Sequence, residues 1–297
     1  LSLFPGISFA AAETEPVASV DQLSDVRGHW ALESIENAVK SGYVKGYPDG
    51  SFRPDRPVSR AEFVSMVNNA LQLRPQNKVA LNFSDVKASD WYYDEIAKAG
   101  YVRYAQGTSA STFSPESVIT RQEAALMLSR FLPKVGMTGK EVLESYPDKG
   151  QLESWAQEGV AITLNKGYMK GHANGLLAPL GTLTRAEAVT LIDQILAGET
   201  IVREDVFVRE SGDILSDKIY VGDITIAEEV GEGDATLQNL SALSVVYVKG
   251  GGSHTVTMEN SLIIRLVVTK EGTQVRVLAA DGTTIYTSIL FNNNLLV

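Results

Sequence analysis

The sequence predicts a fold in two parts: a mainly α bundle of three helical hairpins with pseudo-threefold symmetry, then an all-β region that begins a parallel β-solenoid. Three observations support it. A block of about 60 residues recurs three times between residues 21 and 198. Each copy contains the signature of a capped amphipathic helix. After residue 198, short β runs return about every 10 residues.

The repeat is clearest in one four-residue motif. Ser59-Arg60-Ala61-Glu62 recurs as Thr120-Arg121-Gln122-Glu123 and as Thr184-Arg185-Ala186-Glu187. The same offset relates the three tryptophans of the chain, Trp30, Trp91 and Trp155, and three aspartates, Asp25, Asp85 and Asp148. Units of this size cannot each bury an apolar face alone, so we expect the three to pack on one another.

Each motif predicts the start of a helix. In a capping box, the Ser or Thr hydroxyl accepts from the amide of residue N3, and the Glu at N3 reaches back to the N-cap amide. Apolar residues then follow at i, i+4, i+7 and i+8, starting from Phe63, Ala124 and Ala188. Each repeat is therefore predicted as a Trp-led helix, a Gly/Pro-containing loop and a capped second helix.

The predicted organisation has five segments. Residues 1–20 are typical of the end of a secretory signal peptide with a leader. The repeats are assigned to 21–80, 81–143 and 144–198, and 199–297 to a linker and a β-rich region that we expect to be truncated. No run approaches the ~20 apolar residues of a membrane span, so retention at a surface would depend on binding.

The β-rich region allows two folds. Pairs of β runs repeat at about 20 residues, the length of one coil of a parallel β-helix, and Asn239 and Asn260 follow comparable runs. An immunoglobulin-like sandwich is the alternative, because short strands separated by turn residues are typical of it as well. The repeat length favours the solenoid.

The first repeat resembles the S-layer homology (SLH) domain family through Asp25-Val26, Trp30-Ala31, Gly46-Tyr47, Asp49-Gly50 and Arg60-Ala61-Glu62. The resemblance covers about residues 21–198 and implies a pseudo-threefold bundle that binds pyruvylated secondary cell-wall polysaccharide in grooves between repeats. It also implies ligand-binding roles: Arg60, Arg121 and Arg185 for a carboxylate, Gly50 and Gly175 for close backbone approach, and Trp30, Trp91 and Trp155 as groove walls. The predicted ligand-binding set also includes Asp25, Asp85 and Asp148. The loops of the second and third repeats depart from the family pattern, so the number of competent grooves stays open.

The position of the arginines supports binding independently. Each follows its N-cap, where the helix already carries partial positive charge, and a cation there costs about 0.3–1 kcal/mol. An anion docked between the guanidinium and free helix amides would reverse that sign. The alternative is structural: each arginine pairs with an acidic side chain of a neighbouring repeat, such as Asp25, Asp85 or Asp148. For the tryptophans, the alternative is burial in the core.

Composition narrows the function. The net charge of -10 argues against a nucleic-acid partner, and zero cysteines exclude disulfides and thiolate metal sites. The three histidines have no metal-ligand spacing, so no metal or cofactor is predicted. The leading hypothesis is an extracellular, non-enzymatic protein anchored to the cell wall through an anionic polysaccharide. A wall-associated glycan-degrading enzyme and a self-associating lattice protein are the alternatives.

Overall fold

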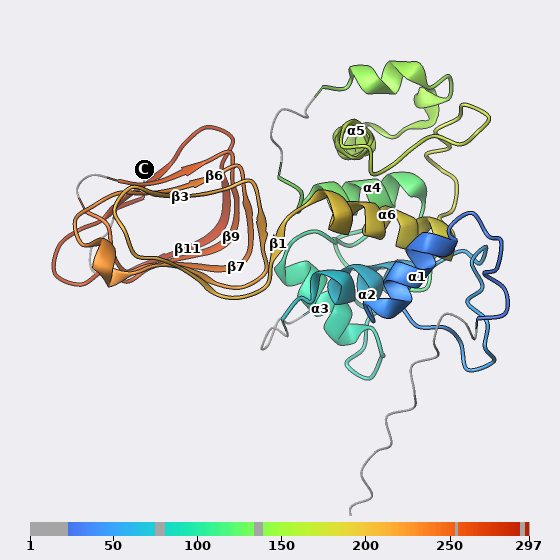
Figure 1. Cartoon of the computed structure of the whole chain (residues 1–297), viewed down its shortest axis with the longest axis horizontal. Helices are drawn as coiled ribbons and strands as arrows, with labels where there is room; N and C mark the ends of the chain where they lie inside the picture. The colour runs from blue at the N-terminus through green and yellow to red at the C-terminus, as the bar shows by residue number, and fades with distance from the viewer. Residues whose placement is uncertain (1–22, 75–80, 134–138, 253–254, 292–294, 297) are drawn as a thin grey trace, which may run out of the picture.

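The computed structural model describes residues 23–74, 81–133, 139–252, 255–291 and 295–296. The signal-peptide prediction for residues 1–20 lies outside these ranges. A helical domain and a β-solenoid lie side by side, and the solenoid has a triangular outline when viewed along its axis (Figure 1).

The helical domain consists of three hairpins, as the repeat predicts. The first helices of the hairpins are α1 (Leu32–Lys40), α3 (Tyr93–Tyr101) and α5 (Gln157–Asn165), and the second helices are α2 (Arg60–Leu71), α4 (Arg121–Ser129) and α6 (Arg185–Gly198). The segment that leads into α5 adds the 3-10 turns η2 (Glu141–Ser145), η3 (Lys149–Gln151) and η4 (Ser154–Ala156). All three predicted capping boxes are present, on Ser59, Thr120 and Thr184.

A closed ring of three backbone hydrogen bonds lies where the repeats meet. Val58 donates to Leu183, Leu183 to Ile119, and Ile119 back to Val58, each at 3.0 Å. All three side chains are buried in one continuous core. Because each residue directly precedes an N-cap, the ring fixes the three capped helices around the pseudo-threefold axis.

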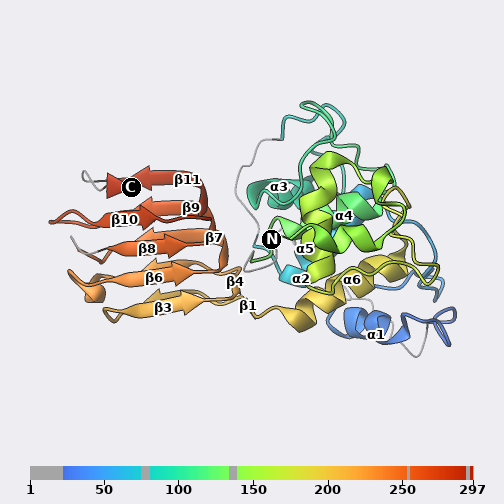
Figure 2. The same ribbon diagram turned by 90° about the horizontal axis from the view of Figure 1, so that it is seen from above.

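The β region is a parallel solenoid, as the 20-residue repeat predicts. Its strands are β1 (Ile201–Val202), β2 (Val206–Val208), β3 (Asp213–Ser216), β4 (Ile219–Tyr220), β5 (Ile224–Ile226), β6 (Ala235–Gln238), β7 (Ser241–Val248), β8 (Val256–Glu259), β9 (Leu262–Val268), β10 (Arg276–Ala279), β11 (Thr284–Leu290) and β12 (Leu295–Leu296), with η5 (Glu228–Val230) at one corner. Every pairing between these described strands is parallel, so the sandwich alternative is wrong. Figure 2 shows the stacked coils from above.

Asparagines stack at one corner of the coils. Asn239 and Asn260 both have positive φ, 55° and 46°, a conformation that Asn tolerates better than most residues. Asn260 Nδ2 donates to Asn239 Oδ1 at 3.4 Å. The corner therefore turns in the same way on successive coils, which explains the 21-residue spacing between these two residues.

The solenoid packs directly on the helical domain. Four buried solenoid residues belong to the same apolar core as the helices: Ile219, Val221, Leu243 and Ile264. Polar contacts surround them. Arg74 pairs with Asp205 at 2.7 Å, and the Arg103 guanidinium lies 5.3 Å from the ring centre of Tyr286.

Candidate functional site

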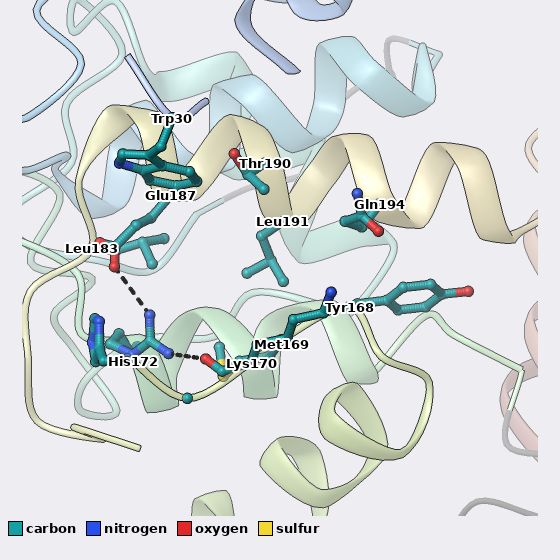
Figure 3. A pocket seen from close by; sticks show the side chains of 12 residues that line it. Trp30, Tyr168, Met169, Lys170, His172, Leu183, Glu187, Thr190, Leu191 and Gln194 are labelled. Atoms are coloured by element: carbon teal, nitrogen blue, oxygen red, sulfur yellow. Dashed lines mark hydrogen bonds and ion pairs between the residues drawn. The ribbon is translucent and has the colours of Figure 1, made fainter. Parts of the chain in front are cut away.

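Three equivalent grooves lie between the repeats, and each is lined by residues from all three. Groove A has a volume of about 250 Å³ and combines Trp30 of the first repeat, Arg121 of the second, and Glu187 with residues 168–172 of the third. Figure 3 shows Trp30 on one side of this groove and His172 and Lys170 on the other. A tryptophan, an arginine and a capping-box glutamate thus meet although they are far apart in sequence.

The other two grooves repeat this arrangement in cyclic order. Groove B, about 400 Å³, contains Trp155, Arg60 and Glu123. Groove C, about 210 Å³, contains Trp91, Arg185 and Glu62. The repeated motif therefore produces three versions of one site.

The tryptophans are exposed, so the interpretation that they belong to the core is wrong. Trp30, Trp91 and Trp155 are 65%, 59% and 50% exposed. Each lies just before or at the start of the first helix of its hairpin, at the rim of a groove. An exposed indole ring beside a groove that contains charged side chains is a suitable surface for packing against a sugar ring.

The arginines are buried and bind the neighbouring repeat. Arg60 is 3% exposed, and its Nε and Nη2 donate to the carbonyls of Phe113 and Gln106, both at 3.0 Å. Equivalent bonds join Arg121 to Leu177 and Lys170, and Arg185 to Phe52 and Lys45. Burial lowers the pKa of all three guanidinium groups. Each arginine therefore fixes the loop of the next repeat while its edge lines a groove.

The capping-box glutamates are the acidic partners of two arginines. Arg60 Nη1 lies 2.9 Å from Glu123 Oε1, and Arg121 Nη1 lies 3.2 Å from Glu187 Oε1. Groove C differs, because Glu62 pairs with Arg56, so the corresponding Arg185 forms no ion pair within the described residues. The alternative that the arginines pair with acidic side chains of a neighbouring repeat is therefore correct for Arg60 and Arg121. The partners are glutamates, however, and among the residues that the structure describes the three predicted aspartates do not pair with the arginines.

The aspartates hold the loops of their own repeats. Asp85 accepts from the amides of Phe113 and Ser114 at 2.9 and 2.7 Å. Asp25 and Asp148 do the same for Phe52 and Arg53, and for Leu177 and Ala178. The second residue of each pair has positive φ, between 50° and 58°. None of the three aspartates lines a groove.

The helix N-termini offer no free amides, which corrects the expected mode of anion binding. The amides of Arg60 and Ala61 donate to the carbonyls of Ser117 and Pro115, and the N3 amide of Glu62 donates to Ser59. The other two capped helices repeat this pattern. An anion would therefore have to bind to side chains. Gly50 and Gly175, with φ of 79°, close loop turns and do not line the grooves.

The grooves are locally cationic although the chain is acidic. Each is lined by two cationic side chains and one carboxylate. The second cation is Lys170 in groove A, Arg130 in groove B and Lys45 in groove C. The sequence interpretation missed these three residues, although the two lysines share one repeat position, fifteen residues before an N1 arginine.

The described residues provide neither a metal site nor a membrane-spanning helix. Among residues 23–74, 81–133, 139–252 and 255–291, no group of three or more His, Asp and Glu side chains is placed to hold a metal ion. In the same part of the chain, no helix combines the length and the apolar character of a membrane span.

Comparison with known proteins defines the class of the helical domain. Residues 22–64, 82–125 and 145–189 match the S-layer homology domain family. The chain thus carries three S-layer homology domains, as the sequence motifs indicate, and it is a cell-wall or cell-surface protein.

Its relatives include surface-layer proteins and an enzyme. The chain is 33% identical to the surface-layer 125 kDa protein of Lysinibacillus sphaericus over 64% of its own length and 16% of that protein. It is 27% identical to S-layer protein EA1 of Bacillus anthracis over 84% of its length and 29% of EA1. It is 30% identical to an amylopullulanase of Thermoanaerobacterium thermosulfurigenes over 58% of its length and 9% of that enzyme. The chain thus spans less than a third of each relative.

Proposed function

We propose that the three S-layer homology domains anchor the protein non-covalently to the cell wall by binding an anionic, pyruvylated wall polysaccharide in the inter-repeat grooves. The observation that carries this is the repeated combination of an exposed tryptophan and two cations in each groove of a chain with a net charge of -10. The ring packs against a sugar face, and the guanidinium and ammonium groups bind its acidic substituent. Local geometry thereby overcomes the repulsion of an acidic protein.

The structural role of the arginines, which hold the loop of the next repeat, is compatible with a role in binding an anion. A guanidinium has five N–H donors, and Arg60 and Arg121 each use Nε, Nη1 and Nη2 within the protein. Their bonds within the protein hold the group rigidly, and Arg121 and Arg60 line grooves A and B. A pre-organised cation loses little conformational entropy when an anion binds.

The test is binding of the full chain to purified wall polysaccharide, before and after its acidic substituents are removed. We expect binding to fall at least tenfold on that removal, and equally in the triple variant Trp30→Ala, Trp91→Ala, Trp155→Ala. Phe207→Ala is the matched control, because Phe207 is a 51% exposed aromatic residue on the solenoid and outside the grooves. Binding that ignores both treatments would contradict the proposal.

Anchoring and catalysis are compatible in a longer protein. The amylopullulanase has a segment similar to this chain, so a wall-attached enzyme is the second candidate for the whole molecule. Self-association in a surface layer is the third, since two relatives are surface-layer proteins. Both alternatives use the helical domain as the tether.

A further inference from the structure

Groove B differs from the other two grooves in where its second cation comes from. In grooves A and C, this cation is an exposed loop lysine, Lys170 or Lys45. The equivalent loop residue in groove B is the neutral Gln106. Its backbone carbonyl accepts from Arg60 as those of the lysines accept from their arginines, so the three positions correspond in space.

A compensating change lies on the second helix of the same repeat. Nine residues after each N1 arginine, a side chain lines the groove: Gln194 in groove A, Asn69 in groove C and Arg130 in groove B. Two repeats thus combine a loop lysine with a helix-borne amide, and the second repeat combines a loop amide with a helix-borne arginine. All three grooves therefore contain two cations, but in groove B the second cation lies on the helix and not on the loop.

Arg130 is held in place by neutral acceptors. Its Nη1 donates to the carbonyl of Tyr104 at 3.1 Å, and its Nη2 donates to Gln106 Oε1 at 3.2 Å. No ion pair with a carboxylate is formed by Arg130 in the part of the chain that the structure describes. Burial lowers its pKa, Tyr286 partly opposes this shift, and the nearby Arg60 cation lowers the pKa further. Two partly desolvated cations therefore share groove B with one carboxylate, and that carboxylate, Glu123, is bound to Arg60.

We propose that Arg130 is a ligand-binding residue of groove B, which supplies the second cationic contact to an acidic group of the polysaccharide in place of the loop lysine. This rests on the proposed anchoring function. A partly buried, pre-organised guanidinium recognises a carboxylate by geometry, whereas an exposed lysine acts as a mobile point charge. Groove B therefore binds its anion with weaker salt dependence than grooves A and C.

The experiment isolates groove B in the full chain. In the background Trp30→Ala, Trp91→Ala, only groove B keeps its ring, and binding to the purified acidic wall polysaccharide is measured. We expect Arg130→Gln to weaken that binding about tenfold, as for loss of a charge-assisted contact. Arg103→Gln is the matched control, because it removes the same charge beside Tyr286 but does not line a groove.

A double variant that moves the second cation of groove B from the helix to the loop provides a further test. Gln106→Lys with Arg130→Asn copies the residues of groove C, and we expect it to bind within about threefold of the background at low salt but to lose affinity more steeply as salt rises. If Arg130→Gln does not fold, Arg130→Lys replaces it: it keeps the charge but not the guanidinium geometry, so we expect a steeper loss of binding with salt than in the background. An unchanged salt dependence would overturn the proposed role of Arg130.

The outcomes separate the two proposals. If the unmodified chain does not bind the polysaccharide, the anchoring proposal fails, and this one fails with it. If that chain binds but the double-tryptophan background does not, groove B is no site. Equal binding by the Arg130→Gln and Arg103→Gln variants overturns the role of Arg130 alone.

Discussion

Arg60 in the first repeat and Glu123 in the second form an ion pair across the repeat boundary, with 2.9 Å between Nη1 and Oε1. The glutamate also closes its own capping box on Thr120. One carboxylate thus caps a helix and fixes the neighbouring repeat, so the repeated motif encodes both the helix start and the assembly of the domain.

Loss of this arginine should destabilise the domain strongly. Arg60→Gln leaves Glu123 without its cationic partner and two loop carbonyls without a donor. We expect the free energy of unfolding to fall by about 3 kcal/mol, as for a broken buried pair. Urea denaturation measures it, with Arg27→Gln as the exposed control, expected to change stability by less than about 0.5 kcal/mol. A loss similar to that of the control would contradict a structural role.

The same change in the third repeat should cost less. Glu62 is paired with Arg56, so Arg185→Gln removes bonds to carbonyls but breaks no ion pair. We expect its destabilisation to be about 1–2 kcal/mol smaller than that of Arg60→Gln. Parallel urea titrations of the two variants compare them, and equal losses would mean that the Glu123 pair contributes nothing.

Local patterns allowed the fold to be predicted, but not the contacts of the site. The capping boxes and the 20-residue coil are visible because helix starts and solenoid corners depend on residues close in sequence. The Arg60 to Glu123 pair joins residues 63 positions apart, and nothing in the motif distinguishes this glutamate from Asp85 as a partner.

The tryptophans show a second limit of prediction from the sequence. An apolar side chain at a fixed position of a helical hairpin is equally compatible with the core and with a groove rim, and Trp30 lies at the rim. The second cations of grooves A and C could have been predicted from the sequence, because Lys45 and Lys170 occupy equivalent repeat positions. Only the folded chain shows that Arg130 takes the place of this lysine in groove B.

The aspartate clamp should make stability depend on pH. Burial alone would raise the pKa of Asp85, but the amides of Phe113 and Ser114 outweigh it and lower the pKa below its usual value of about 3.9. A lowered folded-state pKa adds stability that is present above the unfolded-state pKa and lost as the pH falls through the folded value. We expect Asp85→Asn to lower the thermal midpoint by a few degrees at pH 7, and this difference to shrink below about pH 4. A constant difference would exclude the clamp as its origin.

Two substitutions of Asn239, at the asparagine corner of the solenoid, can distinguish the effect of backbone strain from that of the side-chain hydrogen bond. Asn239 has a φ of 55°, where the backbone strain costs about 1–2 kcal/mol for an alanine and is absent for a glycine. Both substitutions remove the bond from Asn260. We expect Asn239→Ala to be the more destabilising in thermal denaturation. Equal losses would assign the effect to the side chain.

The shared core predicts that the helical domain and the first coils unfold together. Leu243 is a solenoid residue that belongs to the core of the helical domain, whereas Val246, three residues further along β7, belongs to the core inside the coils. Leu243→Ala leaves a cavity at the junction and should cost about 2–5 kcal/mol, because the packed surfaces relax only partly. Calorimetry of the unmodified chain should show one main transition, which Leu243→Ala splits into two as the solenoid detaches. Val246→Ala should weaken the solenoid without detaching it, because the junction keeps its contacts. If the unmodified chain already unfolds in two separate steps, and Leu243→Ala moves only the solenoid step, the junction does not couple the two parts.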